Sequence, residues 1–154
     1  PEDALLRLFA LCHADWSDLG ERLRLSNADR DRLRQYGENT PVLDPAMLED
    51  DLRRARFRQS LPVLLDRSWL TQASVLGVPD KGWDRLRTCL QRMPQPVFPL
   101  TGQDAKDAGL LPGPIMGAWL KAGQSWWLEQ GCRPDRKACL MHLAEAFELL
   151  KKAD

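Results

Sequence analysis

The chain has 154 residues, of which 44% are hydrophobic and 29% are charged, and its formal net charge is zero. This length suits one domain or two small subdomains that share a core. A protein that is coated by nucleic acid usually has an excess of basic residues, so any contact with phosphate must come from a local basic face. The apolar runs are short and broken by charge, so we expect no membrane span and no membrane partner.

The start of the chain and its cysteines favour a cytoplasmic fragment of a longer protein. The chain begins with Pro1-Glu2-Asp3, which is acidic where a signal peptide would be basic, and its first residue is not Met. We therefore expect an excised piece without a secretory leader. Irregular spacing of cysteines in a chain with a good core is typical of reduced thiols in a cytoplasmic protein. The four cysteines are Cys12, Cys89, Cys132 and Cys139.

Helical spacing of apolar residues dominates the first 93 residues. Leu5, Leu8, Phe9 and Cys12 follow the i, i+3, i+4, i+7 pattern of one helix face, and Asp15–Leu25 continues as a second helical stretch. Ser26, with an acid three residues later, predicts the start of a further helix by a capping box. Asp44 followed by Pro45 predicts another helix, which would begin at Pro45.

Two more helices are predicted before residue 94. Pro62 suits the first turn of one, which carries Trp69 on an apolar face. Trp83, Leu86 and Leu90 lie at i, i+3 and i+7 on the next helix. No segment of the chain shows sustained two-residue alternation, so we predict an all-α fold without significant β-sheet.

A proline-rich segment separates the two parts of the chain. Three prolines alternate with other residues in Pro94-Gln95-Pro96-Val97-Phe98-Pro99, which forces an extended path because proline fixes φ and restricts the residue before it. We therefore predict a helical body over residues 1–93, a linker over residues 94–99, and a helix-hairpin-helix with a tail helix over residues 100–154.

The helix-hairpin-helix is the most specific local pattern. Thr101 caps a short helix that stops at Gly109, the segment Leu110–Gly113 forms a tight turn, and Pro114 starts the next helix. That helix is expected to bury Ile115 with the tryptophans that follow it. Gly113 would let a backbone approach closely, and the N-terminus of the following helix offers N–H groups to a phosphate. The alternative is an ordinary corner between two helices in which glycine and proline serve only as caps.

Arginines form two clusters, one early and one in the middle of the chain. Guanidinium groups suit phosphate oxygens, but acids lie at helical pairing distance in both clusters, so salt-bridged surfaces are the alternative. The first cluster is Arg22, Arg24, Arg30, Arg32 and Arg34, and the second is Arg53, Arg54, Arg56 and Arg58.

The residues do not compose a catalytic or metal site. Asp29 and Asp31 resemble a two-carboxylate magnesium motif, but residues two apart on a helix point in different directions and cannot share one ion. Cys132, Cys139 and His142 lack a fourth zinc ligand. No phosphate-binding loop motif and no partnered nucleophile occurs. We therefore predict no catalytic residue, no metal ligand and no cofactor in this chain.

Three stretches together resemble a known family. They are LRLSNADRDRL (residues 23–33), FPLTGQDAKDAGLLPGPIMGAWL (98–120) and WWLEQGCRPDRKACL (126–140). Their order is similar to that in the C-terminal half of bacterial CCA-adding tRNA nucleotidyltransferases and the related poly(A) polymerases. The resemblance implies that this chain holds tRNA, while an N-terminal catalytic head of the same protein binds Mg²⁺ and CTP or ATP. The parent would be an enzyme, and this fragment would be inactive alone.

The resemblance and the basic clusters together select candidate RNA-binding residues. They are Arg22, Arg24, Arg30, Arg34, Arg53, Arg54, Arg56, Arg58, Lys106, Gly113 and Lys121. The expected partners are the tRNA backbone and the catalytic head, and a homodimer is left open. One alternative is a helical protein-interaction or dimerisation module that uses the tryptophan-rich stretch Ile115–Leu128. Another is a helix-hairpin-helix domain that binds duplex DNA.

Overall fold

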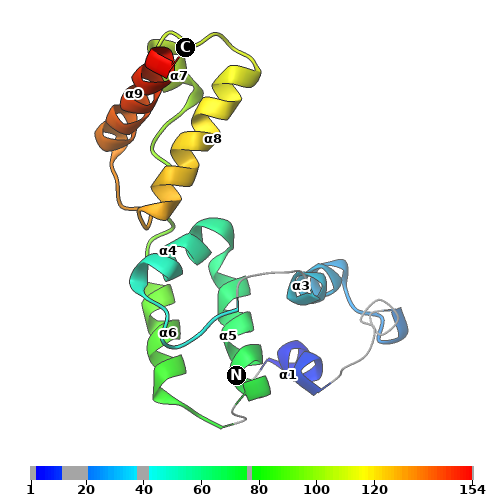
Figure 1. Ribbon diagram of the computed structural model, residues 1–154. Coiled ribbons are helices and arrows are strands. Elements are labelled where there is room, and N and C mark those ends of the chain that lie inside the picture. Colours follow the sequence, from blue (N-terminus) through cyan, green and yellow to red (C-terminus); the bar gives the residue numbers. More distant parts are fainter. Residues whose placement is uncertain (1–2, 12–20, 38–41, 76–77, 154) are drawn as a thin grey trace. The chain divides into compact units, whose positions relative to one another are not determined.

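The computed structural model describes residues 3–11, 21–37, 42–75 and 78–153, and these residues form helices and no strand (Figure 1). The predicted all-α fold is therefore confirmed. Cys12 and most of the predicted helical stretch Asp15–Leu25 lie outside the described residues. The chain divides into two compact units: unit 1 comprises Pro1–Leu48 and Arg58–Pro94, and unit 2 comprises Glu49–Phe57 and Gln95–Asp154.

Unit 1 is built around an antiparallel helix pair. Its described helices are α1 (Ala4–Leu11), α3 (Asn27–Gly37), α5 (Leu61–Val75) and α6 (Lys81–Arg92). In Figure 1, α5 and α6 lie side by side in opposite directions, and α1 and α3 also contact α5. Among the buried side chains of this unit are those of Leu6, Leu33, Leu64 and Leu90.

Side-chain caps set the starts of two of these helices. The Ser26 hydroxyl accepts a hydrogen bond from the Asp29 amide at 3.2 Å and donates one to the Asp29 carboxylate at 2.7 Å, so the predicted start of α3 is confirmed. Asp80 caps α6 by accepting from the amides of Gly82 and Trp83 at 2.9 and 3.1 Å. Each cap satisfies amides that have no partner inside the helix.

The predicted helix start at Pro45 is wrong. The Asp44 carboxylate accepts a hydrogen bond from the amide of Ala46, two residues on, at 2.7 Å. The Asp44 carbonyl accepts another from Met47 at 3.0 Å. This pattern closes a turn over the proline instead of capping a helix, and the helix begins later, at Glu49.

Unit 2 packs its helices around one buried tryptophan. Its helices are α4 (Glu49–Arg58), whose last residue belongs to unit 1, α7 (Gly102–Asp107), α8 (Pro114–Glu129) and α9 (Arg136–Ala153). Figure 1 shows α8 and α9 antiparallel and adjacent. Trp127 is 2% exposed, and its indole N–H donates to the Pro134 carbonyl at 3.0 Å. Phe57 and Phe98 pack edge-on against its ring, with centroids 5.3 and 5.6 Å away.

The division into units differs from the prediction at two places. Glu49–Phe57 was expected in the body of residues 1–93 but groups with unit 2, because Phe57 packs on Trp127. The segment Pro94–Pro99 contains no helix, as expected for its prolines. However, its Phe98 belongs to the aromatic core of unit 2, so most of the segment is part of a packed unit and not a separate linker.

Candidate nucleic-acid interface

A hydrogen-bonded box fixes the short helix α7 at the entrance to the turn. The Asp104 carboxylate accepts from the amide of Thr101 at 2.7 Å and pairs with its hydroxyl at 2.8 Å, as the sequence predicts. Its other oxygen accepts from Arg136 at 2.6 Å, which ties the start of α9 to α7. These bonds lower the pKa of Asp104, with the Thr101 amide as the main cause, because each of them stabilises the carboxylate.

The turn between α7 and α8 depends on two glycines. Gly109, at a φ of +84°, donates to the Lys106 carbonyl at 2.8 Å, and Leu110 donates to the Ala105 carbonyl at 3.0 Å. This pair of bonds is the Schellman ending of a helix, which requires a left-handed residue at the position of Gly109. Gly113 has a φ of +154°, and no atom lies within 4 Å of the position of an added Cβ. The backbone at Gly113 is therefore open to a ligand.

The beginning of α8 presents a smooth exposed face. Pro114, Gly117, Ala118 and Lys121 share one side of the helix by their spacing, and all four are exposed. The amides of the first helical turn have no partner inside the helix and carry the positive end of its dipole. The face thus combines small side chains, available N–H groups and one lysine, while Lys106 is exposed on α7.

The first turn of α8 is more exposed than the sequence predicts. Ile115 was expected to be buried, but its side chain is 71% exposed, and Leu111 in the turn is 83% exposed. The reason is that α8 meets the core through its later turns. There Gly123 lies so close to Leu143 that an added Cβ would be 2.7 Å from a methyl carbon.

The second arginine cluster is largely engaged within unit 2. Arg54 donates to the carbonyls of Leu128 and Glu129 at 2.7 and 2.8 Å, and so caps the C-terminus of α8, where carbonyls lack partners. Arg53 pairs with acids of its own helix. Arg56 is buried, at 6% exposed. The salt-bridged alternative therefore describes this cluster better than a free basic surface does, and only Arg58 at its end is exposed.

The first cluster lies in unit 1, and its members differ in exposure. Arg32 bridges Asp66 at 2.7 Å and Asp3 at 2.8 Å. Arg30 donates to the Leu25 carbonyl at 3.1 Å. The remaining members are exposed, and Arg34 pairs with a neighbouring acid at the surface. They are Arg22, Arg24 and Arg34.

The candidate residues are thus divided between the two units. Those in unit 1 are Arg22, Arg24, Arg30, Arg34 and Arg58. Those in unit 2 are Arg53, Arg54, Arg56, Lys106, Gly113 and Lys121. Only in the second set does a turn with an open backbone occur together with exposed lysines.

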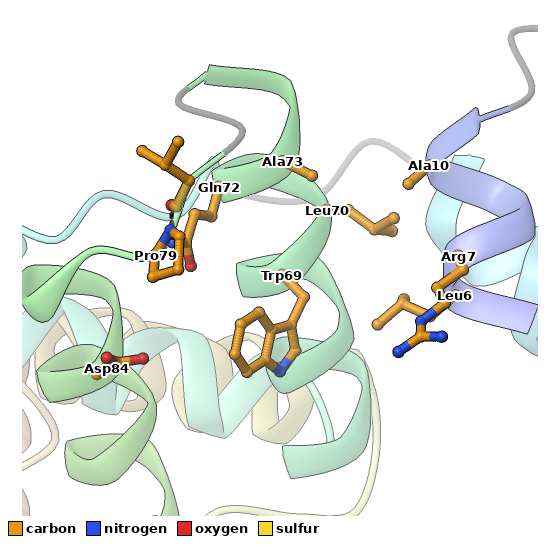
Figure 2. A pocket seen from close by; sticks show the side chains of 10 residues that line it. Leu6, Arg7, Ala10, Trp69, Leu70, Gln72, Ala73, Pro79 and Asp84 are labelled. Carbon is orange, nitrogen blue, oxygen red and sulfur yellow. Dashed lines mark hydrogen bonds between the residues drawn. The ribbon is translucent and has the colours of Figure 1, made fainter. Parts of the chain in front are cut away.

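The sequence does not predict a cleft in unit 1, which has a volume of about 410 Å³ (Figure 2). Its aromatic residue, Trp69, which the sequence places on an apolar helix face, is half-buried and packs against the core cluster of Leu6, Leu33 and Tyr36. No periodic signal marks a cleft of this kind, because its walls come from helices far apart in the chain. The lining residues are Leu6, Arg7, Ala10, Trp69, Leu70, Gln72, Ala73, Val78, Pro79 and Asp84.

The described residues form neither a cluster of metal ligands nor a membrane-spanning helix. Within the part of the chain that the structure describes, no three His, Cys, Asp or Glu side chains gather closely enough to hold a metal ion. No helix among the same residues is long and apolar enough to cross a membrane.

The fold defines an all-α protein of two helical units. No protein-family model matches the chain, and no curated protein or solved structure matches it. The resemblance to nucleotidyltransferases therefore remains a prediction from the three sequence stretches.

Proposed function

We propose that the chain holds the backbone of a structured RNA, with tRNA as the expected partner. The observation that carries this proposal is the open turn before α8, where Gly113 and the first helical turn are exposed, while the two helices that flank the turn carry the exposed Lys106 and Lys121. A phosphate would accept from the amides of Ile115 and Met116, at the positive end of the helix dipole. The small residues of the face would let the RNA backbone approach.

Binding of this kind positions a nucleic acid without reading its sequence. Contacts to phosphate and sugar fix register and orientation, and the deep, narrow major groove of A-form RNA is closed to side chains. A holding role therefore suits a protein that acts on many tRNAs. In the parent enzyme, a CCA-adding or poly(A)-adding nucleotidyltransferase, the catalytic head would add nucleotides to the 3′ end that this chain positions.

The protein-interaction alternative loses the residues on which it depended. Its tryptophan-rich stretch was expected to provide an exposed seam, but Trp119, Trp126 and Trp127 pack with the core of unit 2. Among the large apolar side chains of α8, only Ile115, in its first turn, is exposed.

The test is a titration of labelled tRNA followed by fluorescence anisotropy, from low to moderate salt. The variant is Lys106→Glu with Lys121→Glu. The matched control is Lys81→Glu with Arg92→Glu, which changes the net charge equally at exposed positions of unit 1. We expect the first pair to reduce the salt slope of log K by about two and to weaken binding at least about tenfold at low salt, while the control has a smaller effect.

Three other results would count against the proposal. Equal losses in both variants would mean that only overall charge attracts the RNA. Equal affinity for a DNA duplex of the same length would favour the duplex-DNA alternative. A folded chain that does not bind tRNA even at low salt would favour the interaction module.

A further inference from the structure

The cleft of unit 1 has an aromatic surface with opposite charges at its two sides. Figure 2 shows the indole of Trp69 at its centre, with Asp84 on one side and Leu6 and Arg7 on the other. The lining is mostly apolar, from α1, α5 and the segment before α6. Its volume of about 410 Å³ lies in the range of small-ligand sites.

The indole is held rigidly from behind. The Arg87 guanidinium carbon lies 3.4 Å from the centre of the Trp69 ring, and Arg87 is 6% exposed and absent from the lining. Arg87 therefore covers one face of the ring, while Trp69 also packs against the core cluster of Leu6, Leu33 and Tyr36 and lines the cleft. It donates to Gln72 and Asp84, both at 2.8 Å, and Gln72 in turn donates to the Val78 carbonyl at 2.7 Å.

The arrangement specifies the chemistry of a ligand. The part of the partly buried indole that lines the cleft favours a flat aromatic ring that stacks on it. The Asp84 side chain is 64% exposed, and a carboxylate that accepts one bond from Arg87 retains acceptor capacity for an N–H group of the ligand. The positive charge of Arg7, an exposed residue on the opposite side, favours a negative group near that end of the cleft. An amino-bearing base joined to a phosphate has all three features.

We propose that this cleft binds one unpaired adenine, cytosine or guanine base of the RNA, stacked on Trp69 with its amino edge at Asp84. Unpaired bases that stack on aromatic side chains are a common means of RNA recognition. Uracil has no exocyclic amino group to offer the carboxylate, so it binds more weakly. The inference rests on the proposed function only in its choice of RNA as the source of the base.

The experiment compares single-stranded tetranucleotides of adenosine and uridine on the full chain by calorimetric titration at low salt. Ala73→Phe fills the cleft from an exposed lining position without removing a core side chain. Ser74→Phe, at the next exposed position of α5 and outside the lining, is the matched control. Asp84→Asn replaces the acceptor toward the base by an amide, and circular dichroism checks the fold of each variant.

We expect adenosine to bind at least about fivefold more tightly than uridine, and Ala73→Phe to weaken binding about tenfold or more, as the loss of one stacked base does. Ser74→Phe should leave it unchanged, and Asp84→Asn should remove the preference for adenosine. Equal binding by the chain and Ala73→Phe, or no binding of any tetranucleotide, overturns the proposal.

A blunt RNA duplex, which has no unpaired base, separates this inference from the proposed function. Duplex binding that Ala73→Phe does not change, together with tetranucleotide binding that it abolishes, supports both. If the chain binds the duplex but Ala73→Phe does not change the affinity for tetranucleotides, the proposed function stands and the proposed base site is rejected. If Ala73→Phe abolishes tetranucleotide binding and the chain does not bind the duplex, the base site stands and the proposed function is rejected.

Discussion

The two units use the same residue types in opposite ways. Unit 1 places polar groups between its helices: the Asp66 carboxylate accepts from Arg32 at 2.7 Å and from the Tyr36 hydroxyl at 2.6 Å, and so joins α3 to α5. Between the helices of unit 2 there is instead an aromatic cluster around Trp127. The ion pair of this unit between Arg136 and Asp104 joins the starts of α9 and α7.

The comparison shows that a run of arginines in a sequence does not by itself indicate a phosphate-binding surface. Arg32 and Arg87 in unit 1, and Arg54 in unit 2, each donate hydrogen bonds to acceptors of the protein itself. The lysines of α7 and α8, which form no cluster in the sequence, are exposed, whereas Arg53, Arg54 and Arg56 of the second cluster are not.

The largest expected effect tests the aromatic core of unit 2. Trp127→Ala should destabilise the chain by roughly 3–5 kcal/mol, because it removes a fully buried ring and leaves a cavity. Hydrogen exchange followed by mass spectrometry should show the loss of protection in α8 and α9 and not in α5. Trp126→Ala is the control, since this half-buried ring stacks on His142 at the edge of the core. A cost no larger for Trp127 than for Trp126 would contradict the assignment of the core.

The next effect tests the polar contacts of unit 1. Asp66→Ala should cost about 3 kcal/mol in urea unfolding, because it leaves Arg32 and the Tyr36 hydroxyl without their shared acceptor. Burial, with the Asp66 bond as the second cause, raises the pKa of Tyr36. Asp31→Ala removes the exposed pair with Arg34 on the same helix and should cost less than about 0.5 kcal/mol. Similar losses of unfolding free energy for Asp66→Ala and Asp31→Ala would show that the contacts of Asp66 between helices stabilise the fold no more than an exposed ion pair does.

A smaller effect tests how α4 is docked in unit 2. Gly131→Ala meets two obstacles, since its φ is +71° and an added Cβ would lie 2.4 Å from the Asp50 carboxyl carbon. Gly109→Ala meets only the first, since its φ is +84° and its surroundings are open. Gly109→Ala should cost roughly 1–2 kcal/mol, and Gly131→Ala measurably more. Thermal melting of both variants provides the comparison, and equal costs would mean that Asp50 moves away freely.

The sequence predicts the local features of the fold well, because each has a short-range cause. The caps at Ser26 and Thr101 and the glycine ending at Gly109 all lie where the pattern places them. The start at Pro45 fails for an equally local reason, since Asp44 closes a turn instead of capping a helix.

The candidate site is less predictable because its accessibility depends on distant partners. Nothing near Arg54 in the sequence indicates that its guanidinium reaches the end of α8, and nothing near Phe57 indicates that it packs on Trp127. Ile115 has the spacing of a core residue, but the core begins later along its helix. Those contacts join residues more than fifty positions apart, which periodicity within a helix cannot report.

The smallest expected effect is the pH dependence of the box at the entrance to the turn. The pKa of Asp104 is lowered in the folded chain, chiefly by the Thr101 amide, then by the Thr101 hydroxyl and Arg136. A carboxyl whose folded pKa lies below its unfolded value contributes stability above the unfolded pKa, and that contribution is lost as pH falls through the folded pKa. Asp104→Asn should therefore be less stable than the native chain near neutral pH, and the difference should shrink on acidification below about pH 4. Urea midpoints measured across this range test the expectation.

The control is Asp107→Asn, at an exposed position near the end of the same helix, where the acceptor for Gln103 is retained. A difference for Asp104→Asn that stays constant with pH would show that the box acts through shape and hydrogen bonding, with no contribution from the ionised carboxylate.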